Sequence, residues 1–455
     1  MWTIIPSLTP LLQGLAVAFT EPSFRTHTQI VLGWLMCVGT RTEYRVFRTI
    51  EASAVVTRTR HHPFDRFDNF FSRSAWTVKS LTHQVCALVV VRLCPEGVLY
   101  LVVDDTLLHK RGIKVYGLGW FRDAVASTAK RVATASGNNW VVLGLALPIP
   151  LAPDRIICLA LRARLHLPGP DAPSCVALAK EMLGEIHAQF PDRRVVLIGD
   201  GAYAAQGLLG DLDRRADYVG RMRGDAEVYD PQPPPAVPGK RGPKPKKGPR
   251  LPGPREATRL ADQGAGPGSW HEIAVTVYGV MRVLQVLSYR AVWPEVLGLR
   301  PILIVVVRDP QGKLKDTYLF TTDLTREVSW VVETFARRWS IEVMFKASKQ
   351  VLEIEGPHHW CQESIEKLAP WVWLLQSVIS VWYLTVGRTL PEAESARRDL
   401  GAWDTEWSLN HWVRVFRMAT MSASLRNSPD SDETNDPAEL IERVKNYLFY
   451  VASAA

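Results

Sequence analysis

The segment GVLYLVVDDT (97–106) is an unbroken apolar run that ends in two aspartates. A run of this kind is typical of a strand buried inside a sheet. Two similar runs follow at 140–149 (WVVLGLALPI) and 193–205 (RRVVLIGDGAYAA), and the apolar part of the second ends at Asp200. The segment 175–190 between them is amphipathic and predicts a helix. Strands and helices in this order predict an α/β core with a mixed sheet.

Helical patterns flank this core on both sides. Residues 1–80 predict a helical region whose arginines gather toward its end, and helical patterns return from 335 to 386. Short strand patterns separated by turns lie between 271 and 323. The predicted domains are a helical N-terminal domain (1–80), the first part of the core (81–222), a β-strand insertion (223–322), the second part of the core (323–390) and a helical C-terminal region (391–455).

The composition predicts a soluble protein of two or three domains. The chain has 455 residues, with 54 Lys and Arg against 46 Asp and Glu, a mild basic excess that permits a polyanionic partner without establishing one. Its six cysteines form no CxxC pair, which fits a reducing cytoplasm, and His358, His359 and Cys361 lack the second ligand pair of a zinc site. The N-terminus lacks the basic start of a signal peptide. The apolar stretch 371–386 is too short and polar for a comfortable membrane span, so we expect a buried helix.

One segment of the insertion cannot pack a core. The stretch PQPPPAVPGKRGPKPKKGPRLPGPR (231–255) has ten prolines, seven Lys or Arg and no acidic residue, and it predicts an exposed, extended loop. A solvated linker and a nucleic-acid contact both fit. We favour the contact because uncompensated cations on a stiff loop bind phosphates. The predicted DNA-binding residues of this loop are Lys240, Arg241, Lys244, Lys246, Lys247 and Arg250.

The segment FARRWSIEVMFKASKQ (335–350) predicts a helix that carries a glutamate among cations. Arg338 and Lys346 lie four residues either side of Glu342, so ordinary ion pairs on a solvated face would explain the pattern. At about 100° per residue, one face would hold Phe335, Arg338, Glu342, Lys346 and Lys349.

Three carboxylates stand out by position. Asp105 and Asp200 end apolar strands, and Glu342 lies in the middle of the predicted helix. Converging carboxylates raise one another's pKa unless divalent cations lie between them. Oxygen ligands suit Mg²⁺ or Mn²⁺, and a pair of such ions supports phosphoryl displacement. The nearby cations would then hold the phosphates of a nucleic-acid backbone, namely Arg338, Lys346 and Lys349.

On these residues the chain resembles a bacterial insertion-sequence transposase of the DDE class, with a ribonuclease-H-like core. More narrowly, it resembles the group of insertion-sequence families four and 701. That group carries a Tyr, Arg, Glu, Lys (YREK-type) signature with separations of two, three and six residues. Arg338, Glu342 and Lys349 match this signature, and Phe335 replaces its tyrosine.

Two further motifs of the group are present in order. A strand that ends in Asp-Thr matches Asp105 and Thr106, and a strand that ends in Asp-x-x-Tyr matches Asp200 and Tyr203. The group also inserts mainly β-strands before the glutamate, and here 141 residues separate Asp200 from Glu342. The resemblance covers roughly residues 65–390.

The resemblance implies a transposase that cleaves DNA at the ends of an insertion sequence and joins the 3′ ends to target DNA. It implies two Mg²⁺ ions, replaceable by Mn²⁺, held by Asp105, Asp200 and Glu342. It also implies that the N-terminal domain 1–80 is a DNA-binding domain, with double-stranded DNA partners (terminal inverted repeats and target). A homodimer on DNA and a cytoplasmic, nucleoid-associated bacterial protein are implied as well. Asp104 leaves the choice of the first ligand open. The Asp-Thr motif favours Asp105, and because strand neighbours face opposite sides, we expect Asp104 to point away from the site.

Two alternatives remain. One is a catalytically inactive, transposase-derived DNA-binding protein, and intact carboxylates weigh against it. The other is a structure-selective ribonuclease-H-like nuclease that cuts without joining. Among single residues, Trp270 could stack on an unpaired base or simply pack, and Asn138 and Asn139 are expected in a turn.

Overall fold

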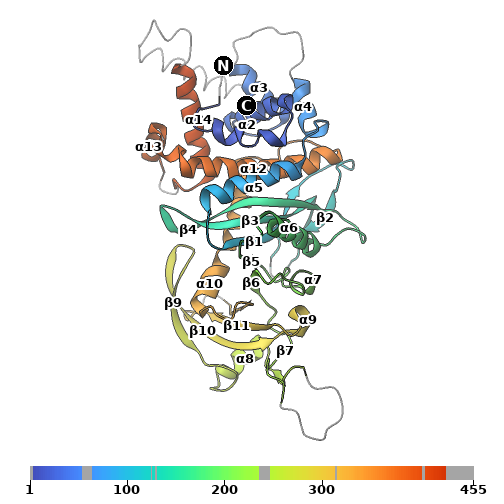
Figure 1. Cartoon of the computed structure of the whole chain (residues 1–455), viewed down its shortest axis with the longest axis vertical. Coiled ribbons are helices and arrows are strands. Elements are labelled where there is room, and N and C mark those ends of the chain that lie inside the picture. The colour runs from blue at the N-terminus through green and yellow to red at the C-terminus, as the bar shows by residue number, and fades with distance from the viewer. Residues whose placement is uncertain are drawn as a thin grey trace.

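Helices, a central sheet and inserted strands follow one another along the long axis of the computed structural model (Figure 1). The structure describes residues 4–53, 64–123, 126–128, 131–234, 246–312, 315–401 and 405–426. Three cations predicted to bind DNA, Lys240, Arg241 and Lys244, lie outside the described residues.

The core is a mixed sheet in the order β4-β3-β1-β5-β6. β1, β5 and β6 run parallel, whereas β3 is antiparallel to both β1 and β4. This mixed sheet confirms the predicted ribonuclease-H-like α/β core. The strands are β1 (Leu99–His109), β3 (Thr134–Ile149), β4 (Ala152–His166), β5 (Val195–Gly199) and β6 (Ala216–Arg221).

Helices cover both faces of the core sheet. α5 (Val78–Leu93) and α12 (Gln362–Thr385) pack together and against β4, and α6 (Cys175–Gln189) packs on β3 and β4. Of the described helices, α12 alone is long and apolar enough to cross a bilayer, but 94% of its most apolar window is buried by the rest of the fold. The expectation of a buried helix at 371–386 is therefore confirmed.

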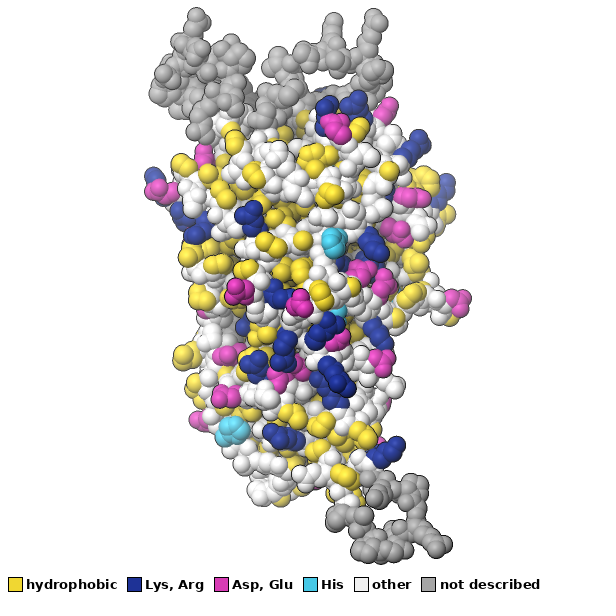
Figure 2. All heavy atoms as spheres, in the orientation of Figure 1, with side chains coloured by type: hydrophobic (Ala, Val, Ile, Leu, Met, Phe, Trp, Pro, Cys, Tyr) yellow, Lys and Arg dark blue, Asp and Glu magenta, His cyan; other side chains and the backbone are white. Residues whose placement is uncertain are grey.

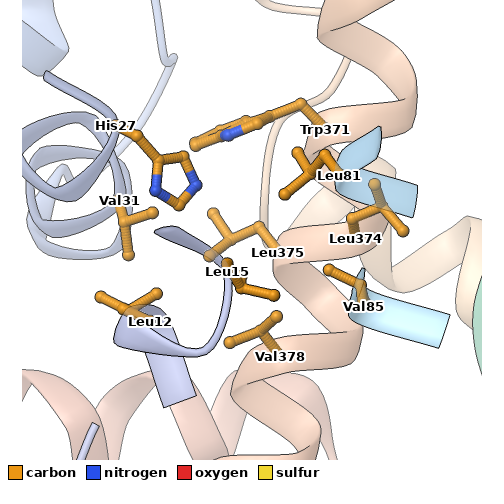
Figure 3. Close-up of a pocket in the computed structure, with 10 residues that line it drawn as sticks. All are labelled: Leu12, Leu15, His27, Val31, Leu81, Val85, Trp371, Leu374, Leu375 and Val378. Atoms are coloured by element: carbon orange, nitrogen blue, oxygen red, sulfur yellow. The ribbon is translucent and has the colours of Figure 1, made fainter. Parts of the chain in front are cut away.

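The N-terminal helices and the last helices form one end of the molecule (Figure 1). Trp34 of α2 packs edge-on against Trp371 of α12, with ring centroids 5.3 Å apart. Figure 3 shows His27 of α2 beside Trp371, at a small cavity of about 10 Å³ between these helices. The helices of this end are α1 (Thr9–Gln13), η1 (Ala16–Ala18), α2 (Glu21–Met36), α3 (Glu43–Ser53), α4 (Phe64–Ser72), η2 (Gly387–Thr389), α13 (Pro391–Arg398) and α14 (Leu409–Arg426).

The inserted strands at the other end continue the core sheet. β12 pairs with β11 on one side and with β6 of the core on the other, so the inserted and core strands form one sheet, which has twelve strands among the described residues. The insertion contains β7 (Val228–Tyr229), β8 (Arg250–Leu251), α8 (Pro254–Ala261), β9 (His271–Val277), β10 (Val280–Val292), α9 (Pro294–Leu297), β11 (Pro301–Arg308) and β12 (Thr317–Thr321). The remaining elements are β2 (Gly119–Arg122), α7 (Gln206–Leu209), α10 (Val328–Ala336) and α11 (Trp339–Gln350).

The predicted helix 335–350 is divided in two. α10 ends at Ala336 and α11 begins at Trp339, with Arg338 in the N-cap position. The amides of Arg337 and Arg338 bond to carbonyls three residues back, which tightens the chain between the two helices. Phe335 therefore lies on α10, and the single face drawn through it and Glu342 is wrong.

Asn138 and Asn139 lie inside β3 and are buried, so their placement in a turn is wrong too. The polar residues around them concealed the strand pattern in the sequence. In the structure, this part of β3 pairs with β1, and that pairing supplies the backbone hydrogen bonds that a turn would have made locally.

Candidate active site

The register of β1 and β5 sets the positions of the strand-end aspartates. Val102 lies opposite Ile198, and two further residues along both chains bring Asp104 level with Asp200. Residues that lie opposite each other in a parallel pair point to the same face of the sheet, so Asp104 and Asp200 share a face. Asp105 faces the other side.

Two glycines leave room for the turn that holds Asp200. A side chain at Gly220 of β6 would meet the carbonyl oxygen of Gly199 at 2.7 Å and the ring of Tyr218 even closer. The Tyr218 hydroxyl donates to the Asp200 carbonyl at 3.2 Å, and the Asp200 carboxylate accepts from the Ala202 amide at 2.8 Å. Backbone and side chain of Asp200 are thus both held.

Arg338 connects the strand to the helix that carries the glutamate. Its Nη1 lies 2.9 Å from Asp104 Oδ2, and its Nη2 lies 2.5 Å from Glu342 Oε1. The Arg338 side chain is only 17% exposed, so these contacts are largely shielded from water. Asp104 therefore faces α11 and Glu342. The expectation that Asp104 points away is wrong: neighbours alternate as expected, but Asp104 is the one on the Glu342 side.

Asp105 has a different set of partners. Tyr203, the tyrosine of the second motif, donates its hydroxyl to Asp105 Oδ1 at 3.3 Å. The Asn139 side chain lies near enough to lower the pKa of Asp105, and its amide nitrogen donates to Cys175 Sγ at 3.8 Å. Tyr203 is buried, so its hydroxyl restrains the Asp105 carboxylate.

The aspartates share an electrostatic environment. Burial raises the pKa of Asp104 to about 7; the charges of Asp200 and Asp105 add to the rise, and Arg338 opposes it. Loss of water around the carboxylate raises the pKa of Asp105, although part of the residue is exposed; Asn139 and Tyr203 oppose that rise, whereas Asp200 adds to it. Burial alone would lower the pKa of Arg338, but the carboxylates of Asp104 and Glu342 outweigh it and raise that pKa.

The side-chain oxygens of the candidate ligands are of the type that binds a hard divalent cation. All candidate ligands are carboxylates, and Asp104, Asp105 and Asp200 repel one another, a repulsion that such a cation would remove. Among the described residues, no three His, Cys, Asp or Glu side chains lie close enough together to form a metal-binding group. Because Glu342 is engaged by Arg338, it would complete such a group only after that contact rearranges.

The cations of α11 lie in different settings. Lys349 donates to the backbone carbonyl of Leu107 in β1 at 2.6 Å, so it fastens α11 to the strand. Lys346 is exposed, one helical turn after Glu342. Figure 2 shows basic side chains mixed with acidic ones across the middle of one face of the molecule. Of the α11 cations, Lys346 is thus the one open to a ligand.

The described cations of the basic loop lie in the insertion, by β7 and β8. Within the described part of that loop, Lys246 is exposed, the Lys247 ammonium lies 3.2 Å from the ring centroid of Tyr229, and Arg250 pairs with Glu227 at 3.3 Å. The structure does not bring these residues next to the aspartates, since β7 and β8 end the sheet order that begins with the core strands.

Trp270 is packed within the insertion. Its indole nitrogen donates to Asp262 at 3.0 Å, and the guanidinium of Arg308 covers one ring face at 4.2 Å from the centroid. That face is already occupied, which favours the packing interpretation over base stacking.

Sequence reasoning did not connect Asn139 with the site, and it gave Asp104 the wrong orientation. Asn139 had no signal in the sequence, because its link to Asp105 depends on β3 pairing with β1. Asp104 was visible, but its orientation depends on the register with β5, which spans a long stretch of chain.

Comparisons with known proteins give a family match and similar solved structures. A family described as DDE superfamily endonuclease matches residues 14–281, more than half of the chain, including both strand-end aspartate positions but not Glu342. None of the curated proteins matches the chain. Among solved structures, the piggyBac transposase in a synaptic complex with hairpin DNA, determined by cryo-EM, is similar at 11% identity over 94% of this chain and 76% of that chain, with a TM-score of 0.40.

Proposed function

The chain belongs to the family of DDE superfamily endonucleases, and from this premise we propose that it is a transposase that cuts DNA at the ends of a mobile element and joins the freed 3′ ends to target DNA. The observation that carries the proposal is the contact of Arg338 with both Asp104 and Glu342, on the sheet face that also bears Asp200. A carboxylate set joined to a shielded guanidinium suits a phosphodiester better than a neutral substrate.

We propose that Asp200 and Glu342, together with one of the two strand aspartates, hold divalent cations. The Asp-Thr motif favours Asp105, whereas the shared sheet face and the link through Arg338 favour Asp104. Bound Mg²⁺ or Mn²⁺ would activate the attacking water or hydroxyl and stabilise the leaving oxygen.

The other residues position the substrate and the ligands. Lys346, exposed beside Glu342, would contact a phosphate of the DNA backbone. Lys349 keeps α11 on β1 through the Leu107 carbonyl, so that the distance between helix and strand is fixed. Tyr203 holds Asp105 through its hydroxyl, which limits the rotation of the carboxylate.

The proposal is tested with the full chain and a supercoiled plasmid that carries the DNA flanking its gene. With Mg²⁺ or Mn²⁺ we expect nicked, linear and joined products, with none in EDTA or with Asp200→Ala. Cut products without joined ones would assign a nuclease instead. A shifted band with no cleavage under any metal would assign a DNA-binding protein derived from a transposase.

A homodimer bridging two DNA ends and a nucleoid location in a bacterial cytoplasm also belong to this proposal. The dimer is tested by mass measurement of the protein alone and on end DNA, and a single protein copy on paired ends would refute it.

A further inference from the structure

Two hollows near the end of β1 lie next to each other. The first, of about 790 Å³, lies between residues 109–115 and 355–360, and the second, of about 510 Å³, lies between 113–120 and 167–168. Ile113 and Val115 line both, so the two hollows adjoin along these residues. We name this surface the aromatic groove, after Trp360 at one end and Trp120 at the other.

Hydrogen bonds hold the walls of the groove in place. The Lys110 ammonium donates to the carbonyls of Glu355 and Pro357, at 3.0 and 2.8 Å. The Tyr116 amide donates to the Trp360 carbonyl at 2.9 Å. The two walls are therefore cross-linked, and the groove exists before any ligand binds.

The surface of the groove combines exposed apolar rings with unpaired cations. Trp360 is 63% exposed, Trp120 is 76% exposed and Ile113 is 98% exposed, which is unusual for such large apolar side chains. Arg111 and Lys114 lie exposed on the same wall, and neither forms an ion pair with another described residue. The carboxylate of Glu355 is engaged by His109 and Lys349. The free charge of the groove is thus positive.

The groove starts where the candidate active site ends. His109, the last residue of β1, lies four residues beyond Asp105, which is about 13 Å along a strand. Its amide donates to Glu355 at 2.8 Å, and Glu355 follows shortly after α11, the helix of Glu342. A strand of nucleic acid that leaves the aspartates in this direction enters the groove directly.

We propose that the aromatic groove binds an unpaired DNA strand next to the cleavage site. Bases stack on Trp360 and Trp120, and the intervening phosphates contact Arg111 and Lys114. A duplex hides the faces of its bases within the stack, so only an unpaired strand offers partners to both exposed rings. Charge complementarity favours this anionic occupant over an apolar peptide or a second copy of the chain. The inference rests on the proposed function in that the substrate is DNA.

The test uses the full chain in EDTA, which separates binding from cleavage, and a fluorescein-labelled oligothymidylate of about 12 nucleotides, within the span of one single-strand site. We expect fluorescence anisotropy to show binding to the oligothymidylate.

Trp360→Ala and Trp120→Ala should each weaken this binding by about 5- to 140-fold, as loss of one stacked base predicts. The matched variants Trp360→Phe and Trp120→Phe keep a ring and should restore most of the affinity. The pair Arg111→Gln and Lys114→Gln should flatten the salt dependence by about 0.7 in log–log slope for each phosphate that is no longer bound. Thermal melts of all variants check that they fold.

The inference would be overturned if both folded Trp→Ala variants bound the oligothymidylate as tightly as wild type does. It would also be overturned if the protein bound a duplex of the same length but not the oligothymidylate. Loss of self-association in the Trp→Ala variants without loss of DNA binding would overturn it too, because the groove would then bind a second copy. The plasmid assay tests the proposed function separately. If the wild-type protein binds the oligothymidylate but never nicks the plasmid, the groove proposal holds and the proposed nuclease activity is refuted. If the protein nicks the plasmid but its single-strand binding does not depend on Trp360 or Trp120, the activity holds and the groove proposal is refuted.

Discussion

Arg338 Nη1 lies 2.9 Å from Asp104 Oδ2, so the N-cap of α11 and the middle of β1 are joined by a direct charged contact. Helix and strand come from opposite ends of the core in the sequence, and the same guanidinium also holds Glu342. This contact determines which side of β1 faces the glutamate, and most of our predictions follow from it.

The two strand aspartates should differ in importance. We expect Asp104→Asn to abolish plasmid nicking, as Asp200→Ala and Glu342→Ala should, because Asp104 shares their side of the sheet. Asp105→Asn keeps a hydrogen-bonding side chain beside Tyr203 and should lose only about tenfold, a typical effect for a residue that supports the ligands. Initial nicking rates in Mg²⁺ and Mn²⁺ measure both. If Asp105→Asn abolished nicking and Asp104→Asn nicked at a near-normal rate, Asp105 would again be the better candidate for the metal ligand.

Arg338 should matter for folding as well as for activity. Arg338→Ala leaves the carboxylates of Asp104 and Glu342 without their shared partner, and we expect a loss of about 1.5–3 kcal/mol in the free energy of unfolding, the range for charged hydrogen bonds. Arg338→Lys keeps the charge but cannot reach both carboxylates with a planar fork, so it should recover only part of that loss. Urea unfolding measures the difference, and equal stability of Arg338→Ala and wild type would contradict it.

Phe335 should act through its ring. It is largely buried on α10, with the guanidinium carbons of Arg221 and Arg338 at 5.6 and 6.0 Å from the ring centroid. Phe335→Ala should cost about 3–5 kcal/mol of stability and lose activity, since the turn before Arg338 loses its packing. Phe335→Tyr, which restores the residue of the signature, should keep or modestly raise activity. Melting temperatures read together with nicking time courses separate the two effects, and a stable, active Phe335→Ala would refute the packing.

Acid should destabilise the protein through His27. Burial lowers the pKa of His27 to about 3, and its Nδ1 has no hydrogen-bond partner among the described residues. The unfolded chain takes up a proton below about pH 6.5 whereas the folded chain does not, so stability falls as the pH drops from about 6.5 toward 3. The loss attributable to this group is about 2 kcal/mol between pH 7.5 and pH 5.

His27→Leu should therefore flatten the pH dependence of unfolding in that window, even if it lowers stability at neutral pH by losing the stack on Phe19. The exposed His83→Gln is the control and should leave the slope as in wild type. Parallel pH profiles for His27→Leu and wild type would show that another group causes the acid sensitivity.

The basic loop should supply affinity rather than chemistry. Glutamine at all six predicted positions should weaken duplex binding and lower the log–log salt slope by about 0.9 for each phosphate that the loop no longer neutralises. Arginine at the lysine positions keeps the charge and should preserve the slope. Filter binding over a salt series measures it, and an unchanged slope with glutamine would identify the loop as a solvated linker. The positions are Lys240, Arg241, Lys244, Lys246, Lys247 and Arg250.

The strands and site residues that could be predicted from the sequence are those that depend on a local residue pattern. β1 and β5 were predicted because their apolar runs are unbroken, and Asp200 because the second run ends there. β4 was missed, since its buried half is interrupted by Arg162 and Arg164, which pair with Glu185 of α6. A charged residue inside an apolar run predicts the end of a strand, unless the residue with which it pairs on another element is known.

Orientation was harder to predict than position. Alternation along β1 shows that Asp104 and Asp105 face opposite sides, but only pairing with β5 and the placement of α11 show which side holds Glu342. The break between α10 and α11 was missed for a similar reason: no Gly or Pro marks it, and each residue there is in the right-handed helical region.

The pairing of β12 with β6 has a mechanical consequence. Main-chain hydrogen bonds run without a break from the β9–β10 hairpin through β11 and β12 to β6, and from there to β5 and Asp200. The inserted strands and the strands that end at the aspartates therefore belong to one hydrogen-bonded sheet, with no unpaired linker between them. A rearrangement that keeps this sheet intact has to occur in elements outside the ladder, and the turn at Arg337 and Arg338 is one of these.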